Sequence, residues 1–304
     1  MNNGFKFLLV LIAIFVLSVV LTPPIYAILF PISSFFKFER IFNRLIMVFS
    51  VVAACLFAIG PRIRKGGTFW DPEAWREYGF DFSKPWKKLF GYGFLGGALT
   101  ILILAVLEVV FGPRYLRQPI LIQDIIERFG KGMLSGMTVG IVEEFFFRGF
   151  IFTQLRRKMG SVFGPLILTS AFYSAAHFFN NGQIFVPPHP TIADAMHLLV
   201  GYLEPILKRP SVIFPEFTGL FLFGVLLNEA FVRTRSLFLP IGLHAGAVFL
   251  IKFQYSFVRP GPPDVYHPLF GKVPYYDGPI EWQLLLILGF AVWCLTRRNA
   301  SVDS

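Results

Sequence analysis

Acidic residues are scarce in this sequence, and cysteine is almost absent. The 304 residues include 18 Asp or Glu and two cysteines, Cys55 and Cys294. Both cysteines lie inside apolar runs, which argues against a disulfide framework, and no CxxC spacing is present to hold a metal. A carboxylate inside an apolar run of this chain therefore needs a specific reason to be there.

Three familiar protease patterns are also missing. There is no His-Glu-x-x-His, so the usual helical zinc-protease signature is absent. The apolar runs contain neither a Ser–His arrangement nor a pair of aspartates, which weakens the serine and aspartyl protease interpretations.

Apolar residues dominate the composition of the sequence. The chain is 55% hydrophobic and 17% aromatic, with 38 Phe and a mean hydropathy of +0.63, which is too apolar for an ordinary soluble domain. The net charge of +10 invites a nucleic-acid interpretation, but Lys and Arg stand in short clusters between apolar runs, as membrane-flanking charges do. We therefore predict an all-α polytopic membrane protein, a single integral membrane domain over residues 1–304, with lipid and not nucleic acid as its surroundings.

Eight apolar runs are read as transmembrane helices. Pro23-Pro24 is expected to kink or end the first run, and Gly60-Pro61 to end the second. Residues 112–131 alternate charged and apolar groups, as in a helix lying in the membrane interface. The predicted spans are about 5–30, 45–59, 89–111, 132–155, 162–179, 211–231, 236–257 and 280–295.

Eight spans place both termini on one side of the membrane. With the amino terminus in the cytoplasm, the inner segments hold 15 Lys or Arg and the outer segments 11. The positive-inside rule therefore favours cytoplasmic termini, and we expect a bacterial inner (plasma) membrane protein. The first run has no small-x-small cleavage site and is expected to be a retained helix.

The run from Val142 to Arg148 places two glutamates and an arginine inside the otherwise apolar segment 132–155. Each such charge near a membrane midplane costs about 2.5–3.5 kcal/mol on insertion scales, so a functional site with paired charges is expected. Residues four apart share a helical face, which pairs Glu144 with Arg148. Glu143 then lies on another face and can accept a proton as a general base. The alternative is a cluster that only locks one helix to its neighbours.

Two histidines, His177 and His244, fall well inside other apolar runs. If the three helices pack together, Glu143 and one or both imidazoles can hold and deprotonate a water, directly or through a bound divalent metal. Imidazole and carboxylate are ordinary zinc ligands, so all three side chains are candidate ligands. Such a site suits amide hydrolysis in or beside the membrane, with an imidazole donor stabilising the tetrahedral oxyanion.

These residues resemble the CPBP family of intramembrane proteases, which comprises CAAX prenyl protease type II and bacteriocin-processing enzymes and is also called the abortive-infection family. The motifs span about residues 131–255. They are Glu143-Glu144-x-x-x-Arg148 followed by Gly149, the aromatic-x-x-x-His set from Tyr173 to His177, and His244 preceded by Ser236-Leu237 and Pro240-Ile241.

The resemblance implies about eight membrane helices and an endopeptidase acting on a membrane-embedded or membrane-associated peptide. It assigns water activation to Glu143 and His177, and leaves His244 to assist at the oxyanion or to bind a metal. Glu144 and Arg148 would hold the site in shape. The resemblance leaves open whether zinc or another divalent metal is the cofactor or whether the enzyme is a metal-free glutamate protease.

Two positions depart from the family pattern. Tyr173 stands where the pattern usually has Phe, and it adds a hydroxyl donor. Val248 stands one helical turn after His244, where the family often has Asn or Asp, and valine cannot donate to an oxyanion. Asn228 or Glu229 on the preceding predicted helix is our candidate for the missing polar group.

Two non-protease functions stay open from the sequence. Val248 favours a non-catalytic membrane scaffold or immunity-type factor that keeps the polar cluster for helix packing. A transporter with a buried charge relay is the third interpretation, and it is disfavoured because the sequence has no inverted repeat and no matching pair of broken helices.

Overall fold

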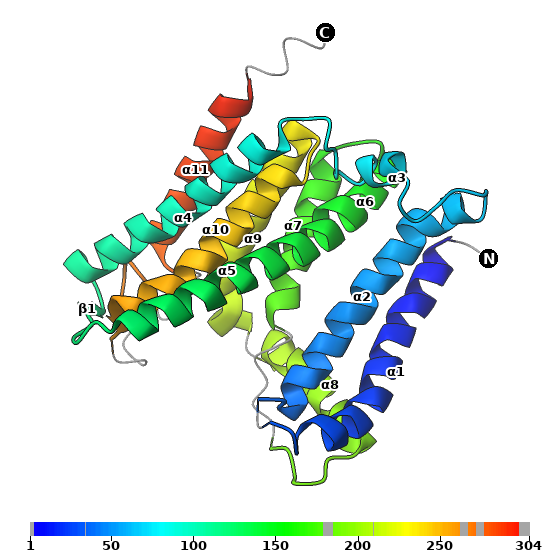
Figure 1. Cartoon of the computed structure of the whole chain (residues 1–304), viewed down its shortest axis with the longest axis horizontal. Coiled ribbons are helices and arrows are strands. Elements are labelled where there is room, and N and C mark those ends of the chain that lie inside the picture. Colours follow the sequence, from blue (N-terminus) through cyan, green and yellow to red (C-terminus); the bar gives the residue numbers. More distant parts are fainter. Residues whose placement is uncertain are drawn as a thin grey trace. The chain divides into compact units, whose positions relative to one another are not determined.

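The structure, a computed structural model, describes residues 3–33, 35–178, 185–208, 210–261, 267–271 and 277–297. These residues are mostly helical, with two strands of three residues each, which confirms the predicted all-α class (Figure 1). The helices are α1 (Asn3–Leu29), α2 (Phe38–Ile63), α3 (Pro72–Arg76), α4 (Trp86–Phe111), α5 (Ile122–Glu144), η1 (Phe145–Phe152), α6 (Thr153–Met159), α7 (Phe163–His177), α8 (Ile192–Lys208), α9 (Pro210–Thr234), α10 (Phe238–Phe253), η3 (Gln254–Ser256) and α11 (Pro279–Arg297).

The helices belong to two compact units. Unit 1 comprises Met1–Gly66 and Ala175–Ile213, and unit 2 comprises Gly67–Ser174 and Phe214–Ser304. The boundary between them falls inside α7, after Ser174. The single integral membrane domain over residues 1–304 stays a prediction.

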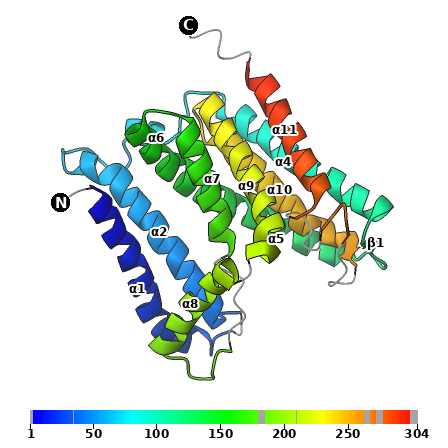
Figure 2. The same cartoon turned by 180° about the vertical axis from the view of Figure 1, so that it is seen from behind.

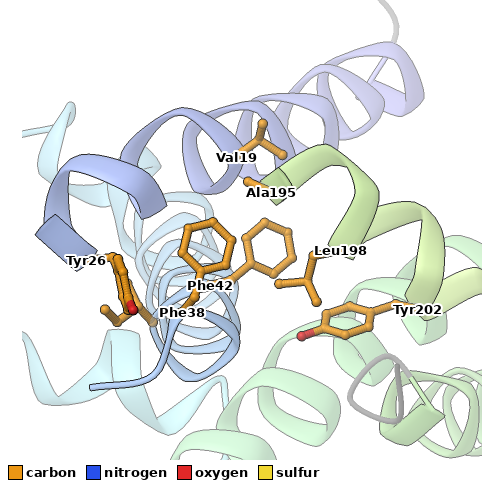
Figure 3. Packing of buried hydrophobic residues seen from close by; sticks show 8 residues of the cluster. Val19, Tyr26, Phe38, Phe42, Ala195, Leu198 and Tyr202 are labelled. Carbon is orange, nitrogen blue, oxygen red and sulfur yellow. The ribbon is translucent and has the colours of Figure 1, made fainter. Parts of the chain in front are cut away.

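Unit 1 packs α1, α2 and α8 around an aromatic core (Figure 3). The ring of Tyr26 meets Phe38 edge to face at a centroid distance of 5.5 Å, and the ring of Phe42 lies 5.9 Å from Tyr202. Each well-oriented aromatic pair adds about 0.5–1.5 kcal/mol beyond the area that it buries. These contacts join the amphipathic helix α8 to the α1–α2 pair.

Unit 2 is built around α10, which runs between α4 and α5 (Figures 1 and 2). Glycines allow the three backbones to approach closely. A Cβ atom at Gly97 of α4 would lie 2.1 Å from the carbonyl oxygen of Leu243, and one at Gly136 of α5 would lie 2.5 Å from that of Ala245. Because only glycine fits at such distances, these positions fix how deeply α10 is buried.

A short antiparallel sheet joins the ends of α4 and α10. Strand β1 (Arg114–Leu116) follows α4, and strand β2 (Val258–Pro260) follows η3. Tyr115 pairs with Arg259 at the centre of the register. The pairing fixes the two helices relative to each other along their length.

Six of the described helices are long and apolar enough to cross a membrane, which agrees with an integral membrane protein; the expected count of eight is not confirmed. The predicted fourth and fifth spans are not among the six. The first part of the fourth lies in α5, whose amino-terminal half is rich in charge, and α7 has only 15 residues. The predicted end of the fifth span, at residue 179, lies outside the described residues. The six segments are Leu9–Leu29, Phe38–Ile63, Trp86–Phe111, Pro210–Thr234, Phe238–Ser256 and Pro279–Arg297.

Two predicted helix limits are wrong. Helix α1 agrees with the predicted span 5–30 and continues through Pro23 and Pro24, whereas α2 does not end at Gly60-Pro61 but continues through Pro61 to Ile63. A proline removes one backbone donor, and a membrane helix tolerates the loss when neighbouring groups satisfy the freed carbonyl. The segment predicted as a separate interfacial helix also differs, because from Ile122 onward it forms the first turns of α5 itself.

Candidate active site

Glu144 and Arg148 form a buried ion pair, which confirms the predicted pairing on one helical face. Arg148 Nη1 donates to Glu144 Oε1 at 3.0 Å, and Nη2 donates to the backbone carbonyl of Gly224 in α9 at 3.1 Å. Both side chains are fully buried. The guanidinium carbon lies 4.6 Å from the ring centroid of Tyr173 in α7, close enough for a cation–π interaction. Arg148 therefore links the glutamate helix to both α7 and α9.

Arg148 lies in η1, a π-helical segment that begins directly after Glu144. Such segments are rare and occur frequently at functional sites. The ring of Phe147 packs edge to face on Tyr173 at 5.1 Å. The π-helix thus continues α5 with a changed register, and its Phe147 ring lies beside the guanidinium of Arg148.

Glu144 also orients His244 of α10. The Nδ1 atom of His244 lies 2.8 Å from Glu144 Oε1. An ionised carboxylate only accepts hydrogen bonds, so Nδ1 carries the hydrogen and donates it. The other ring nitrogen, Nε2, then faces Glu143, with 4.0 Å between Nε2 and Glu143 Oε2. Aromatic rings flank the imidazole edge to face, Phe223 at 5.4 Å and Tyr173 at 6.2 Å between centroids.

The two adjacent glutamates occupy different environments. The side chain of Glu144 is fully buried and interacts with Arg148 and His244, whereas the side chain of Glu143 is 25% exposed. The 4.0 Å between Glu143 Oε2 and His244 Nε2 is too long for a direct hydrogen bond and is a separation at which one water can bridge. The arrangement therefore offers an acceptor and an oriented imidazole to one small polar molecule.

His177 is the last residue of α7 and lies one helical turn beyond Tyr173. It belongs to unit 1, whereas Glu143 and His244 belong to unit 2. The proximity of His177 to Glu143 and His244 therefore stays a prediction.

The unit 2 donors alone do not fit a metal site. Glu143 Oε2 and His244 Nε2 are two donors of suitable chemistry, and the Glu144 carboxylate on Nδ1 matches the usual support of a metal-bound histidine. A catalytic zinc takes three protein ligands. Among the residues that the structure describes, no group of three or more His, Cys, Asp or Glu side chains is placed to hold an ion. Metal binding with His177 as the third ligand stays a prediction, and no chemical step is derived through it.

Asn228 packs α9 against α7. Its Nδ2 atom donates to the hydroxyl of Ser170 at 2.9 Å and to the carbonyl oxygen of Leu166 at 3.3 Å, and the side chain is fully buried. Both amide hydrogens are thus used in helix packing. Glu229, the other candidate for the donor that Val248 cannot supply, pairs with Arg233.

Asn228→Ala is expected to lower the free energy of unfolding by about 1–3 kcal/mol, because it leaves buried polar partners on α7 unsatisfied. The cleavage rate per folded molecule should change by less than about twofold, since a neutral hydrogen bond lost outside the reaction is worth little to the rate. Denaturation in detergent and cleavage assays measure the two effects separately. A tenfold rate loss without loss of stability would restore Asn228 as an oxyanion donor.

Sequence reasoning missed two residues that shape this site. The carbonyl of Gly224 accepts from Arg148, and the ring of Phe223 covers His244. A glycine within an apolar helix indicates close approach of another helix, so a contact at Gly224 could have been predicted from the sequence. Phe223 carries no such signal, because a phenylalanine in an apolar run of a membrane protein is equally suited to face lipid.

The fold and this cluster define a helical membrane protein with a buried site of carboxylate, guanidinium and imidazole groups. A family model described as Type II CAAX prenyl endopeptidase Rce1-like matches residues 127–250. The matched segment contains Glu143, His177 and His244 and nearly coincides with the predicted region 131–255, so the resemblance to the CPBP family is confirmed there. No curated protein and no solved structure matches the chain.

Proposed function

We propose that this protein is an intramembrane endopeptidase that hydrolyses a peptide bond in a membrane-associated protein or peptide. The match over residues 127–250 supports endopeptidase activity at the level of the family. The observation that carries the proposal is the buried Glu144–His244 pair, which turns Nε2 of His244 toward Glu143.

In the proposed reaction, Glu143 and His177 activate one water molecule. The water oxygen attacks the carbonyl carbon of the scissile bond while Glu143 accepts a water proton. The tetrahedral oxyanion then collapses, the C–N bond breaks, and the proton held by Glu143 passes to the leaving amine. Charge developing on the oxyanion needs a preorganised donor, and removal of such a donor typically costs about 10²- to 10³-fold in rate.

His244 is the proposed oxyanion donor. Because Nδ1 already donates to Glu144, Nε2 can donate only when the ring carries both hydrogens. Without the second hydrogen, Nε2 instead offers a lone pair, as a metal ligand would. Either role requires the ring orientation that Glu144 imposes.

A non-catalytic scaffold or immunity-type factor is the second candidate. Its supporting observations are Val248, which offers no donor, and the contacts of Arg148, which tie together three helices as a purely structural cluster would. The family match favours the protease.

We further propose that both termini lie in the cytoplasm and that the membrane is a bacterial inner membrane. The larger number of Lys and Arg in the segments assigned to the inside, 15 against 11, supports the cytoplasmic termini.

The protein purified into proteoliposomes is expected to cleave a membrane-anchored peptide, and His177→Gln is expected to lower the rate by about 10²- to 10⁴-fold. A quenched fluorogenic peptide with a prenylated C-terminal cysteine motif and its unprenylated twin test both substrate chemistries. His267→Gln, in the loop before α11, is the matched control and should keep full activity. A parallel assay with a metal chelator distinguishes the metal-dependent mechanism from the metal-free one, because only a metal-dependent enzyme loses activity when the metal is removed. Equal rates for both variants would contradict the role of His177.

A further inference from the structure

One end of unit 2 carries a surplus of exposed cations. At this end α4 begins, α6 and α11 end, and α9 turns into α10 (Figure 1). Contacts tie these ends together, because Lys84 Nζ donates to the backbone carbonyls of Thr234 and Arg235 at 2.7 and 3.2 Å. We call it the cationic end, and define it by the exposed side chains of Lys87, Lys88, Arg156, Lys158, Arg235 and Arg297.

These six cations lack the acidic partners that other basic residues have. Most acidic side chains at the same end are already used in the ion pairs Arg76–Asp81, Arg157–Glu77 and Arg233–Glu229. Within the described part of the chain, none of the six defining residues forms an ion pair. The surplus positive charge is therefore directed outward.

The opposite end of unit 2, where β1 and β2 lie, is balanced. Three of its basic residues pair with neighbouring acids, and further buried acids, Asp277 and Glu281, stand at the start of α11. The pairs are Arg114 with Glu108, Arg117 with Asp124, and Lys131 with Glu127. The two ends of the same helices thus differ in charge, so the surplus is not a general property of the surface.

Aromatic side chains stand among the cations. Lys87 Nζ lies 5.5 Å from the ring centroid of Trp86, and the guanidinium of Arg297 lies 4.7 Å from that of Trp293. Phe82 nearby has 62% of its surface exposed. Tryptophan and basic residues together at the ends of apolar helices mark the headgroup layer of a membrane. The partner of these cations is therefore found in that layer and not in bulk water.

We infer that the cationic end binds the phosphate groups of anionic phospholipids. Each Lys or Arg near a charged membrane surface strengthens attraction by about fivefold, and the attraction fades beyond roughly one Debye length of 8–10 Å. The six exposed cations lie on α4, α6, α11 and the turn between α9 and α10. The inference is independent of peptide cleavage, and it places the cationic end in the leaflet that holds the anionic lipid.

The test measures lipid retained by the full-length protein after extraction from nanodiscs of mixed phosphatidylglycerol and phosphatidylcholine, using native mass spectrometry. The unmodified protein should retain phosphatidylglycerol in excess over its share of the bilayer. The triple variant K87Q/K88Q/K158Q should lower this preference by more than tenfold. The matched triple R128Q/K131Q/R259Q, at the balanced end, should change it by less than about twofold.

Equal retention of both lipids by the unmodified protein, or equal losses in the two triple variants, would overturn the inference. Inorganic phosphate added at the lipid concentration should leave phosphatidylglycerol bound, and displacement by it would assign the surface to soluble phosphate instead. Gel filtration and thermal melting establish that each variant is folded. Glu143→Gln should keep the lipid preference, so failure of the protease proposal and failure of this one are distinguishable.

Discussion

Glu143→Gln is expected to lower the rate of peptide cleavage by about 10²- to 10⁴-fold, the usual contribution of a general base. The amide keeps the size of the side chain but cannot accept the proton of the attacking water. The fold should tolerate the change, because the Glu143 side chain is 25% exposed and the buried ion pair of Arg148 is with Glu144. Single-turnover cleavage in proteoliposomes measures the effect.

The matched control is Glu127→Gln, on an exposed turn of the same helix. It makes the same chemical change and removes the same charge, and it should leave the rate within about twofold, as expected for a surface pair of little energetic value. A Glu143→Gln protein that is folded and cleaves at the original rate would remove the base from the proposed mechanism. It would favour the scaffold interpretation if it also complemented a deletion strain.

Arg148→Met is expected to lower the free energy of unfolding by about 3–5 kcal/mol, because it leaves the fully buried Glu144 carboxylate without its cation. The change also removes the hydrogen bond to Gly224 and the cation–π contact with Tyr173. Cleavage should fall as well, since His244 depends on Glu144 for its orientation. Denaturation in detergent, followed by circular dichroism, measures the stability.

The companion variant carries Glu144→Gln together with Arg148→Met. A neutral glutamine still accepts from His244 Nδ1 and no longer buries an unpaired charge, so the double variant should be more stable than Arg148→Met alone. Strictly additive losses would show that Arg148 acts by packing and not through the charge of Glu144.

The helix pattern was largely predictable from apolar runs. The predicted starts and ends of α4, α9 and α11 differ from the observed limits by a few residues, because abrupt changes from apolar to charged residues mark them. Pro61 misled the prediction of the end of α2, because this proline remains inside the helix. The start of α5 was also misjudged, because charges on one face of a long helix resemble a separate surface segment.

The site was predictable only where local spacing decides it. The Glu144–Arg148 pair follows from the four-residue repeat of a helix, and the structure contains it. The bond between Glu144 and His244 joins residues 100 positions apart and depends on how α5 and α10 pack, which no local pattern reports. The π-helix after Glu144 was equally hidden, because a phenylalanine-rich run reads as an ordinary apolar helix.

The glycine contacts of α10 have a consequence for substrate entry. With its backbone pressed against α4 at Gly97 and against α5 at Gly136, α10 cannot rotate or slide without parting two tightly fitted surfaces. His244 and the two glutamates are therefore held in place by the tight packing of α4, α5 and α10. If the protein is the endopeptidase that we propose, any helix movement that admits a polypeptide to Glu143 is expected in α7 or α9 and not in α10; the contacts of Arg148 link α7 and α9 to the glutamate helix.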